Sequence, residues 1–97
     1  MSLFVIRHRH EADHCPARDP AMGAMLLQHL SPANATQQGV TIHGEAVIDG
    51  AHTLYMIVEA EGKDTVDAFM KPFAMAGEVD VMQASACEAV VARGGCE

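Results

Sequence analysis

The chain is poor in aromatic and in basic residues. Aromatic side chains make up 4% of its 97 residues, tryptophan is absent, and six Lys and Arg stand against 13 Asp and Glu, for a net charge of −7. Nucleic acids and anionic membrane surfaces attract basic proteins, and single-stranded nucleic acid stacks on aromatic side chains. The composition therefore argues against nucleic acid and against a membrane surface as partners.

Long apolar runs are missing too. No stretch approaches the roughly 20 apolar residues that cross a bilayer, and the start of the chain, Met1–Arg7, lacks the charged beginning and the apolar core of an export signal. We therefore expect a cytoplasmic protein.

The length allows one domain, residues 1–97, and the 49% of hydrophobic residues favours a folded domain. A chain of this length buries a small hydrophobic core, so a bound metal or a second subunit would add to its stability.

Cysteine is scarce, whereas histidine and methionine are abundant. The three cysteines, Cys15, Cys87 and Cys96, are odd in number and widely spaced, which is not typical of a disulfide framework. The chain has six His and seven Met. Three of the histidines, at positions 8, 10 and 14, lie close together, and Cys15 follows directly. This His/Cys cluster is the most informative feature of the sequence.

Periodicity and turn residues predict alternating strands and helices. Apolar and β-branched runs predict strands over residues 3–10, 40–48, 53–60 and 78–84. Cap and proline signals at Asp19-Pro20 and Ser31-Pro32 predict a helix over 21–30 and a second short turn. Asp64 is the expected cap of a further helix, which Pro72 must kink or end near Lys71. A short helix is expected after Ser85.

The resulting order, βαββαβ, is the ferredoxin-like α+β pattern. Right-handed crossovers give one four-stranded antiparallel sheet in the order 4-1-3-2, with the helices on one face. The third predicted strand, residues 53–60, is apolar on both of its faces, whereas a strand with one wet face alternates. We therefore expect a second copy of the chain to cover the open face of the sheet, as a homodimer.

This order and the two-sided third strand resemble the dimeric α+β barrel superfamily. The likeness lies in Thr53–Ala60, the turn after it, Asp64–Met70 and Val79–Val81. Within the superfamily the chain is similar to small uncharacterised bacterial families, among them a nickel-binding one. The superfamily also contains monooxygenases, haem-degrading enzymes and a non-haem iron sulfur oxygenase. The resemblance implies the fold and the dimer, and it makes metal binding or oxygenase-like chemistry on a small molecule the expected functions.

The His/Cys cluster has the residue types that hold transition metals. Imidazole and thiolate are preferred ligands of Zn²⁺, Cu, Ni²⁺ and Fe. His8 and His10 point the same way from a strand, about 7 Å apart, and the loop after them brings His14 or Cys15 back toward them. In the predicted sheet, the end of the first strand neighbours the starts of the third and fourth, near His52 and the Glu78/Asp80 region. The predicted metal ligands are His8, His10, His14, Cys15 and His52.

Other interpretations of the same residues stay open. The cluster also suits a proton-handling histidine site in a small α+β-barrel enzyme, or polar residues at a strand end. His10 to His14 matches the H-E-x-x-H of zinc peptidases, but that motif needs a helix, and Pro16 disfavours one here. Cys15 lies just before a predicted helix start, where thiolates are nucleophilic, which suits a thiol redox sensor. His43, Cys87 and Cys96 are expected at the opposite end of the sheet.

Overall fold

The computed structural model describes all residues, Met1–Glu97. Four strands and five helices alternate along the chain, with two short 3₁₀ turns, Ala12–His14 and Pro16–Arg18, after the first strand. The elements are β1 (Ser2–Arg9), α1 (Pro20–His29), α2 (Pro32–Gln37), β2 (Thr41–Ile48), β3 (Thr53–Ala60), α3 (Lys63–Phe69), α4 (Lys71–Ala74), β4 (Glu78–Ala84) and α5 (Cys87–Arg93).

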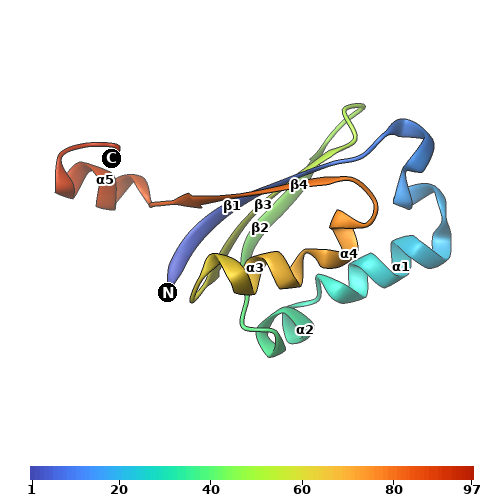
Figure 1. Cartoon of the computed structure of the whole chain (residues 1–97), viewed down its shortest axis with the longest axis horizontal. Coiled ribbons are helices and arrows are strands. Elements are labelled where there is room, and N and C mark those ends of the chain that lie inside the picture. Colours follow the sequence, from blue (N-terminus) through green and yellow to red (C-terminus); the bar gives the residue numbers. More distant parts are fainter.

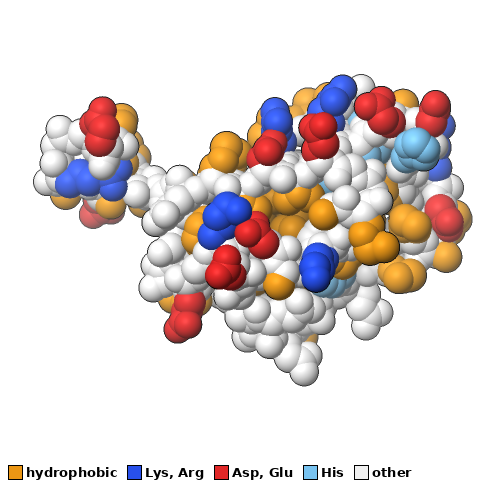
Figure 2. Space-filling view, viewed as in Figure 1, with side chains coloured by type: hydrophobic (Ala, Val, Ile, Leu, Met, Phe, Trp, Pro, Cys, Tyr) orange, Lys and Arg blue, Asp and Glu red, His pale blue; other side chains and the backbone are white.

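The strands form one antiparallel sheet in the order β2-β3-β1-β4. This is the predicted order 4-1-3-2 counted from the other edge, so the ferredoxin-like α+β arrangement is confirmed. Helices α1 to α4 lie on one side of the sheet, and α5 projects past its end (Figure 1). In the space-filling view α5 is a lobe separate from the body (Figure 2), and none of its residues is buried. No helix combines the length and the apolar composition that a membrane crossing requires.

The core lies between the sheet and α1 to α4. It follows the alternation of β1 and β3, because every second side chain of a strand points to the helices. The buried apolar residues are Phe4, Ile6, Ala35, Val40, Leu54, Met56, Val58, Ala60, Val66, Phe69, Met70 and Phe73. His8 continues the β1 series and is 2% exposed. His8, a titratable residue, is therefore the last buried residue of the row that Phe4 and Ile6 begin on β1.

The predicted caps are confirmed at α1 and α2 and wrong at α3. The Asp19 carboxylate accepts hydrogen bonds from the backbone N–H groups of Ala21 (3.0 Å) and Met22 (3.3 Å), and the hydroxyl of Ser31 caps α2. Asp64, the expected cap of α3, lies inside its first turn, because the helix begins at Lys63, two residues earlier than a cap at Asp64 predicts. Extended Gly62 takes the cap position, and an acidic side chain in the first turn still suits the helix dipole.

The face of the sheet that carries no helix has an exposed apolar group flanked by charged side chains. Tyr55, Ile57 and Met82 project from it with 40%, 46% and 46% of their surface exposed. Beside them Arg7 pairs with Asp80, and this carboxylate raises the pKa of the guanidinium through a hydrogen bond and its charge. The homodimer expected from the two-sided third strand stays a prediction, which this exposed apolar face supports.

Candidate metal site

Three of the predicted ligands come together at one end of the sheet. His10 follows the last residue of β1, His52 ends the turn between β2 and β3, and Cys15 lies between the two 3₁₀ turns. One ligand atom from each of the three lies within 4.8 Å of the others. Nε2 of His10 is 3.2 Å from Nδ1 of His52, with the ring centroids 5.1 Å apart. We call this group the His10–Cys15–His52 cluster.

The sheet register brings the two histidines together. β1 pairs antiparallel with β3 so that Arg9 lies opposite Thr53. The next residues outward are His10 and His52, and the backbone N–H of His10 donates to the carbonyl of His52 at 3.2 Å. Residues 42 apart in sequence are thus held side by side by a strand pairing that the sequence predicts.

His52 adopts an unusual backbone conformation. Its φ of +50° lies in the left-handed region, and it is the one non-glycine residue of the chain with a positive φ. A side chain there costs about 1 kcal/mol or more, which is why glycine, asparagine or aspartate usually takes such turn positions. Strained residues of this kind gather at functional sites. A histidine in place of a glycine here favours a role for its side chain.

Gly77 allows another backbone to approach the site closely. A Cβ added to it would lie 2.3 Å from the carbonyl oxygen of Arg9 and 3.0 Å from Cα of His10. Only glycine fits, so the turn that leads into β4 packs directly on the chain at His10. Gly77 is not among the site residues predicted from the sequence. Its position just before a strand start was the available signal, but the contact depends on the tertiary fold.

The loop after β1 brings Cys15 back to the histidines. Pro16 is buried and anchors the second 3₁₀ turn, and Cys15 is half-buried between the turns. His14 is exposed and lies outside the cluster, at the end of the three-residue turn Ala12–His14. His10 and His14 therefore do not share a helix, so the H-E-x-x-H spacing does not form the peptidase arrangement, which needs both on one helical face.

His8 lies behind the cluster rather than in it. Its ring contacts Phe73 edge-on at 5.2 Å and lies 5.5 Å from the ring of His10, between centroids. Two buried ring nitrogens have no hydrogen-bond partner, Nε2 of His8 and Nδ1 of His10. The strand alternation that predicts His8 and His10 on one face is confirmed. The ligand role predicted for His8 stays a prediction.

The surroundings lower the pKa of both His8 and His10. Burial lowers the pKa of His8, with a further lowering by the charge of His10, while a backbone hydrogen bond with Phe73 opposes both. Burial likewise lowers the pKa of His10, and the neighbouring His52 adds to the effect. A neutral imidazole presents the lone pair that a metal requires. The lowered pKa of His10 therefore favours the neutral imidazole that suits metal binding.

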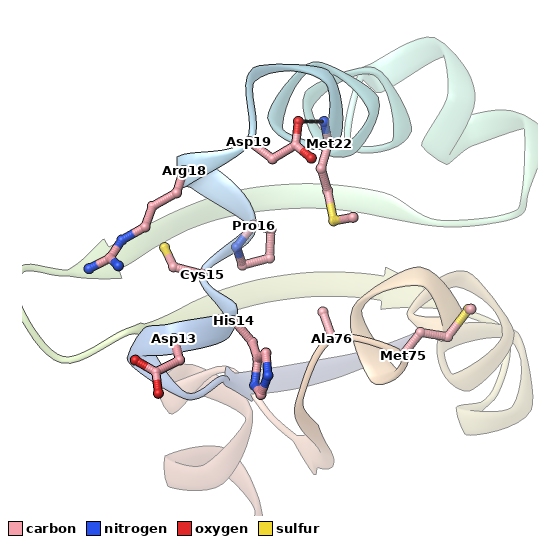
Figure 3. Close-up of a pocket in the computed structure, with 9 residues that line it drawn as sticks. All are labelled: Asp13, His14, Cys15, Pro16, Arg18, Asp19, Met22, Met75 and Ala76. Carbon is pink, nitrogen blue, oxygen red and sulfur yellow. Dashed lines mark hydrogen bonds between the residues drawn. The ribbon is translucent and has the colours of Figure 1, made fainter.

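Two hollows flank the cluster. The larger, about 610 Å³, is lined by Cys15, His14 and Arg18 among others (Figure 3), and the smaller, about 300 Å³, is lined by His10, His14 and Glu78. In Figure 3 the His14 ring and the Cys15 sulfur leave consecutive residues in different directions. Glu78 lines the smaller hollow with His10, as the strand order predicts, whereas Asp80, two residues farther along β4, pairs with Arg7.

The remaining histidines and cysteines lie elsewhere. His43 pairs with Glu59 at 2.7 Å, and Cys87 and Cys96 are exposed at and beyond α5. His29 has a structural role between α1 and α3 that was not predicted from the sequence. Its Nε2 lies 2.6 Å from the Phe69 carbonyl, and its ring stacks on Phe69 at 4.4 Å, which fastens α1 to α3.

Comparison of the chain with protein-family models, with curated proteins and with solved structures finds no match. The resemblance to the dimeric α+β barrel superfamily therefore stays a prediction, and the site is interpreted from its own chemistry.

Proposed function

We propose that the protein binds one transition-metal ion through His10, Cys15 and His52. The observation that carries the proposal is the convergence of two imidazoles and a thiol within 4.8 Å, from three separate parts of the fold. Two nitrogens bound to a tetrahedral ion at about 2.0–2.1 Å lie about 3.3–3.4 Å apart. The 3.2 Å between the His10 and His52 nitrogens matches this separation.

The ligand types narrow the choice of metal. Mixed nitrogen and sulfur ligands favour Zn²⁺, Ni²⁺, Cu or Fe over Mg²⁺ and Ca²⁺, which prefer oxygen. Three protein ligands leave a tetrahedral ion one open position. His14, exposed beside both hollows, is the predicted ligand that would reach this position by a movement of its side chain.

The test is metal loading of the untagged protein, purified without chelator. We expect one Zn²⁺, Ni²⁺ or Co²⁺ per chain in wild type and much weaker binding in His10→Ala, Cys15→Ser and His52→Ala. The matched controls are His43→Ala and Cys87→Ser, which change the same residue types far from the cluster and should bind like wild type. Equal binding by all variants, or no binding by wild type, would remove the proposal.

The larger hollow favours a second candidate, a metal-dependent reaction on a small molecule. Its volume of about 610 Å³ is in the range of small-molecule pockets, about 300–1,000 Å³, and Cys15 forms part of its wall. An open metal position beside such a hollow is the arrangement of catalytic rather than structural sites. A Co²⁺ spectrum that shifts when a small anion such as azide is added supports this candidate, and an unchanged spectrum favours a closed binding site.

We also propose that the chain forms a homodimer through the open face of its sheet. A small domain rarely leaves a contiguous group of large apolar side chains in water. Tyr55, Ile57 and Met82 form such a group in the middle of the sheet. A second copy brings the same face and buries it symmetrically.

A further inference from the structure

Two unpaired ring nitrogens lie next to the proposed metal site. Nε2 of His8 and Nδ1 of His10 are both buried and lack hydrogen-bond partners. His8 is 2% exposed, so bulk water does not reach it. Buried polar atoms are paired in the great majority of native proteins, and an exception calls for an explanation. The explanation lies in the tautomers that metal binding imposes.

Metal binding fixes the tautomer of His10. Its Nε2 faces His52 across 3.2 Å and is the nitrogen that would bind the ion. A nitrogen that binds a metal offers its lone pair, so the ring proton must be on the other nitrogen. Nδ1 of His10, one of the two unpaired atoms, then becomes a buried N–H donor that needs an acceptor.

His8 offers that acceptor. The Phe73 backbone raises the pKa of the His8 ring, as a carbonyl oxygen that faces a ring N–H does. Because Nε2 has no partner, we assign this N–H to Nδ1, which leaves an unprotonated lone pair on Nε2. The two unpaired atoms are thus a donor and an acceptor on neighbouring rings.

We propose that His8 is a positioning residue that accepts the His10 Nδ1–H and so holds Nε2 of His10 ready for the metal. The two nitrogens are not bonded to each other in the structure, so the bond requires the neighbouring rings to turn toward one another. The nitrogens of His10 and His52 are 3.2 Å apart while their ring centroids are 5.1 Å apart. The ring centroids of His8 and His10 are 5.5 Å apart, which is 0.4 Å (5.5 minus 5.1) farther. Outer partners of this kind orient metal-binding histidines and raise their affinity. The inference rests on the proposed metal function and adds a residue that does not touch the ion.

The experiment titrates the full chain with Co²⁺, whose visible absorption reports the number and type of ligands. His8→Phe keeps a ring in the core but removes the acceptor, and His8→Gln restores an acceptor oxygen. We expect His8→Phe to bind Co²⁺ about 10- to 100-fold more weakly than wild type, with the same spectrum at saturation. His8→Gln should recover part of the loss, and the control His43→Phe should match wild type.

Two results would overturn the inference while the proposed function stands. One is wild-type affinity in His8→Phe, and the other is a saturated spectrum with one ligand fewer, which would make His8 a ligand. If His8→Phe does not fold, nitrogen NMR of Zn²⁺-loaded wild type decides. Protons on Nδ1 of both His8 and His10 are expected, and a proton on Nε2 of His8 contradicts the assignment. Absence of Co²⁺ binding by wild type would instead remove the metal site itself.

Discussion

At the scale of single residues, His52 links local strain to the proposed function. Its φ of +50° disfavours any side chain. In His52→Gly we expect the free energy of unfolding of the metal-free protein to rise by about 1 kcal/mol, because glycine adopts this conformation without penalty. Co²⁺ affinity should fall by at least about tenfold, since a ligand is lost.

Denaturant unfolding and Co²⁺ titration of the same samples check both halves of this prediction. His52→Asn is the matched control, because asparagine also tolerates left-handed backbone but does not supply the imidazole. Unchanged Co²⁺ affinity in His52→Gly would show that the strained turn serves something other than the metal.

The histidines of β1 give a second prediction at this scale, on pH. Burial lowers the pKa of both His8 and His10 in the folded chain, whereas in the unfolded chain each takes its ordinary value of about 6.5. Between the lowered values and about 6.5 the unfolded chain binds more protons, so stability rises with pH in that window. The metal-free protein should therefore lose stability as pH falls through about 6.5.

Denaturant midpoints at a series of pH values measure this loss. His8→Phe removes one of the two groups and should flatten the pH dependence, whereas His43→Phe should leave it unchanged. A wild-type midpoint that does not fall as the pH drops from about 7.5 to about 5.5 would contradict the prediction.

At the scale of elements, the turn before β4 holds the end of β1 in place. In Gly77→Ala the new Cβ meets the Arg9 carbonyl at 2.3 Å, so one of the two backbones must move. We expect a loss of about 1–3 kcal/mol in stability together with weaker Co²⁺ binding, because His10 moves with Arg9. Gly62→Ala is the control, since nothing lies within 4 Å of its added Cβ.

Thermal melts and Co²⁺ titrations of the two glycine variants make this comparison. A Gly77→Ala protein as stable as Gly62→Ala would mean that the β1 and β4 backbones do not approach as closely as described.

At the scale of the whole molecule, the homodimer that we propose is tested by changing the open face of the sheet. Wild type should sediment as a dimer that dissociates on dilution, and Ile57→Lys should be a monomer, because it places a charge in the middle of the apolar face. Met25→Lys on α1, where the side chain is 72% exposed, is the control and should remain dimeric. A monomer mass for wild type at every concentration would contradict the proposal.

Much of this protein follows from its sequence. Asp19-Pro20 and Ser31-Pro32 mark helix starts, and Pro72 marks the break between α3 and α4. The alternation of β1 places Phe4, Ile6 and His8 on one face, and His10 follows directly after the strand. These features are local, because caps, prolines and two-residue periodicity act over a few residues. The strand order follows as well, since the handedness of crossovers leaves few topologies for βαββαβ.

The tertiary structure decided which of the five predicted ligands converge. The sequence places His8, His10, His14 and Cys15 together, but letters do not show where a ring nitrogen points. The β1–β3 register places His10 beside His52, 42 residues later in the sequence. The 3₁₀ turns bring Cys15 close to both histidines and leave His14 exposed. His8 is buried in the core behind the cluster. Ligand geometry depends on contacts between distant segments, and these exist only once the whole sheet has formed.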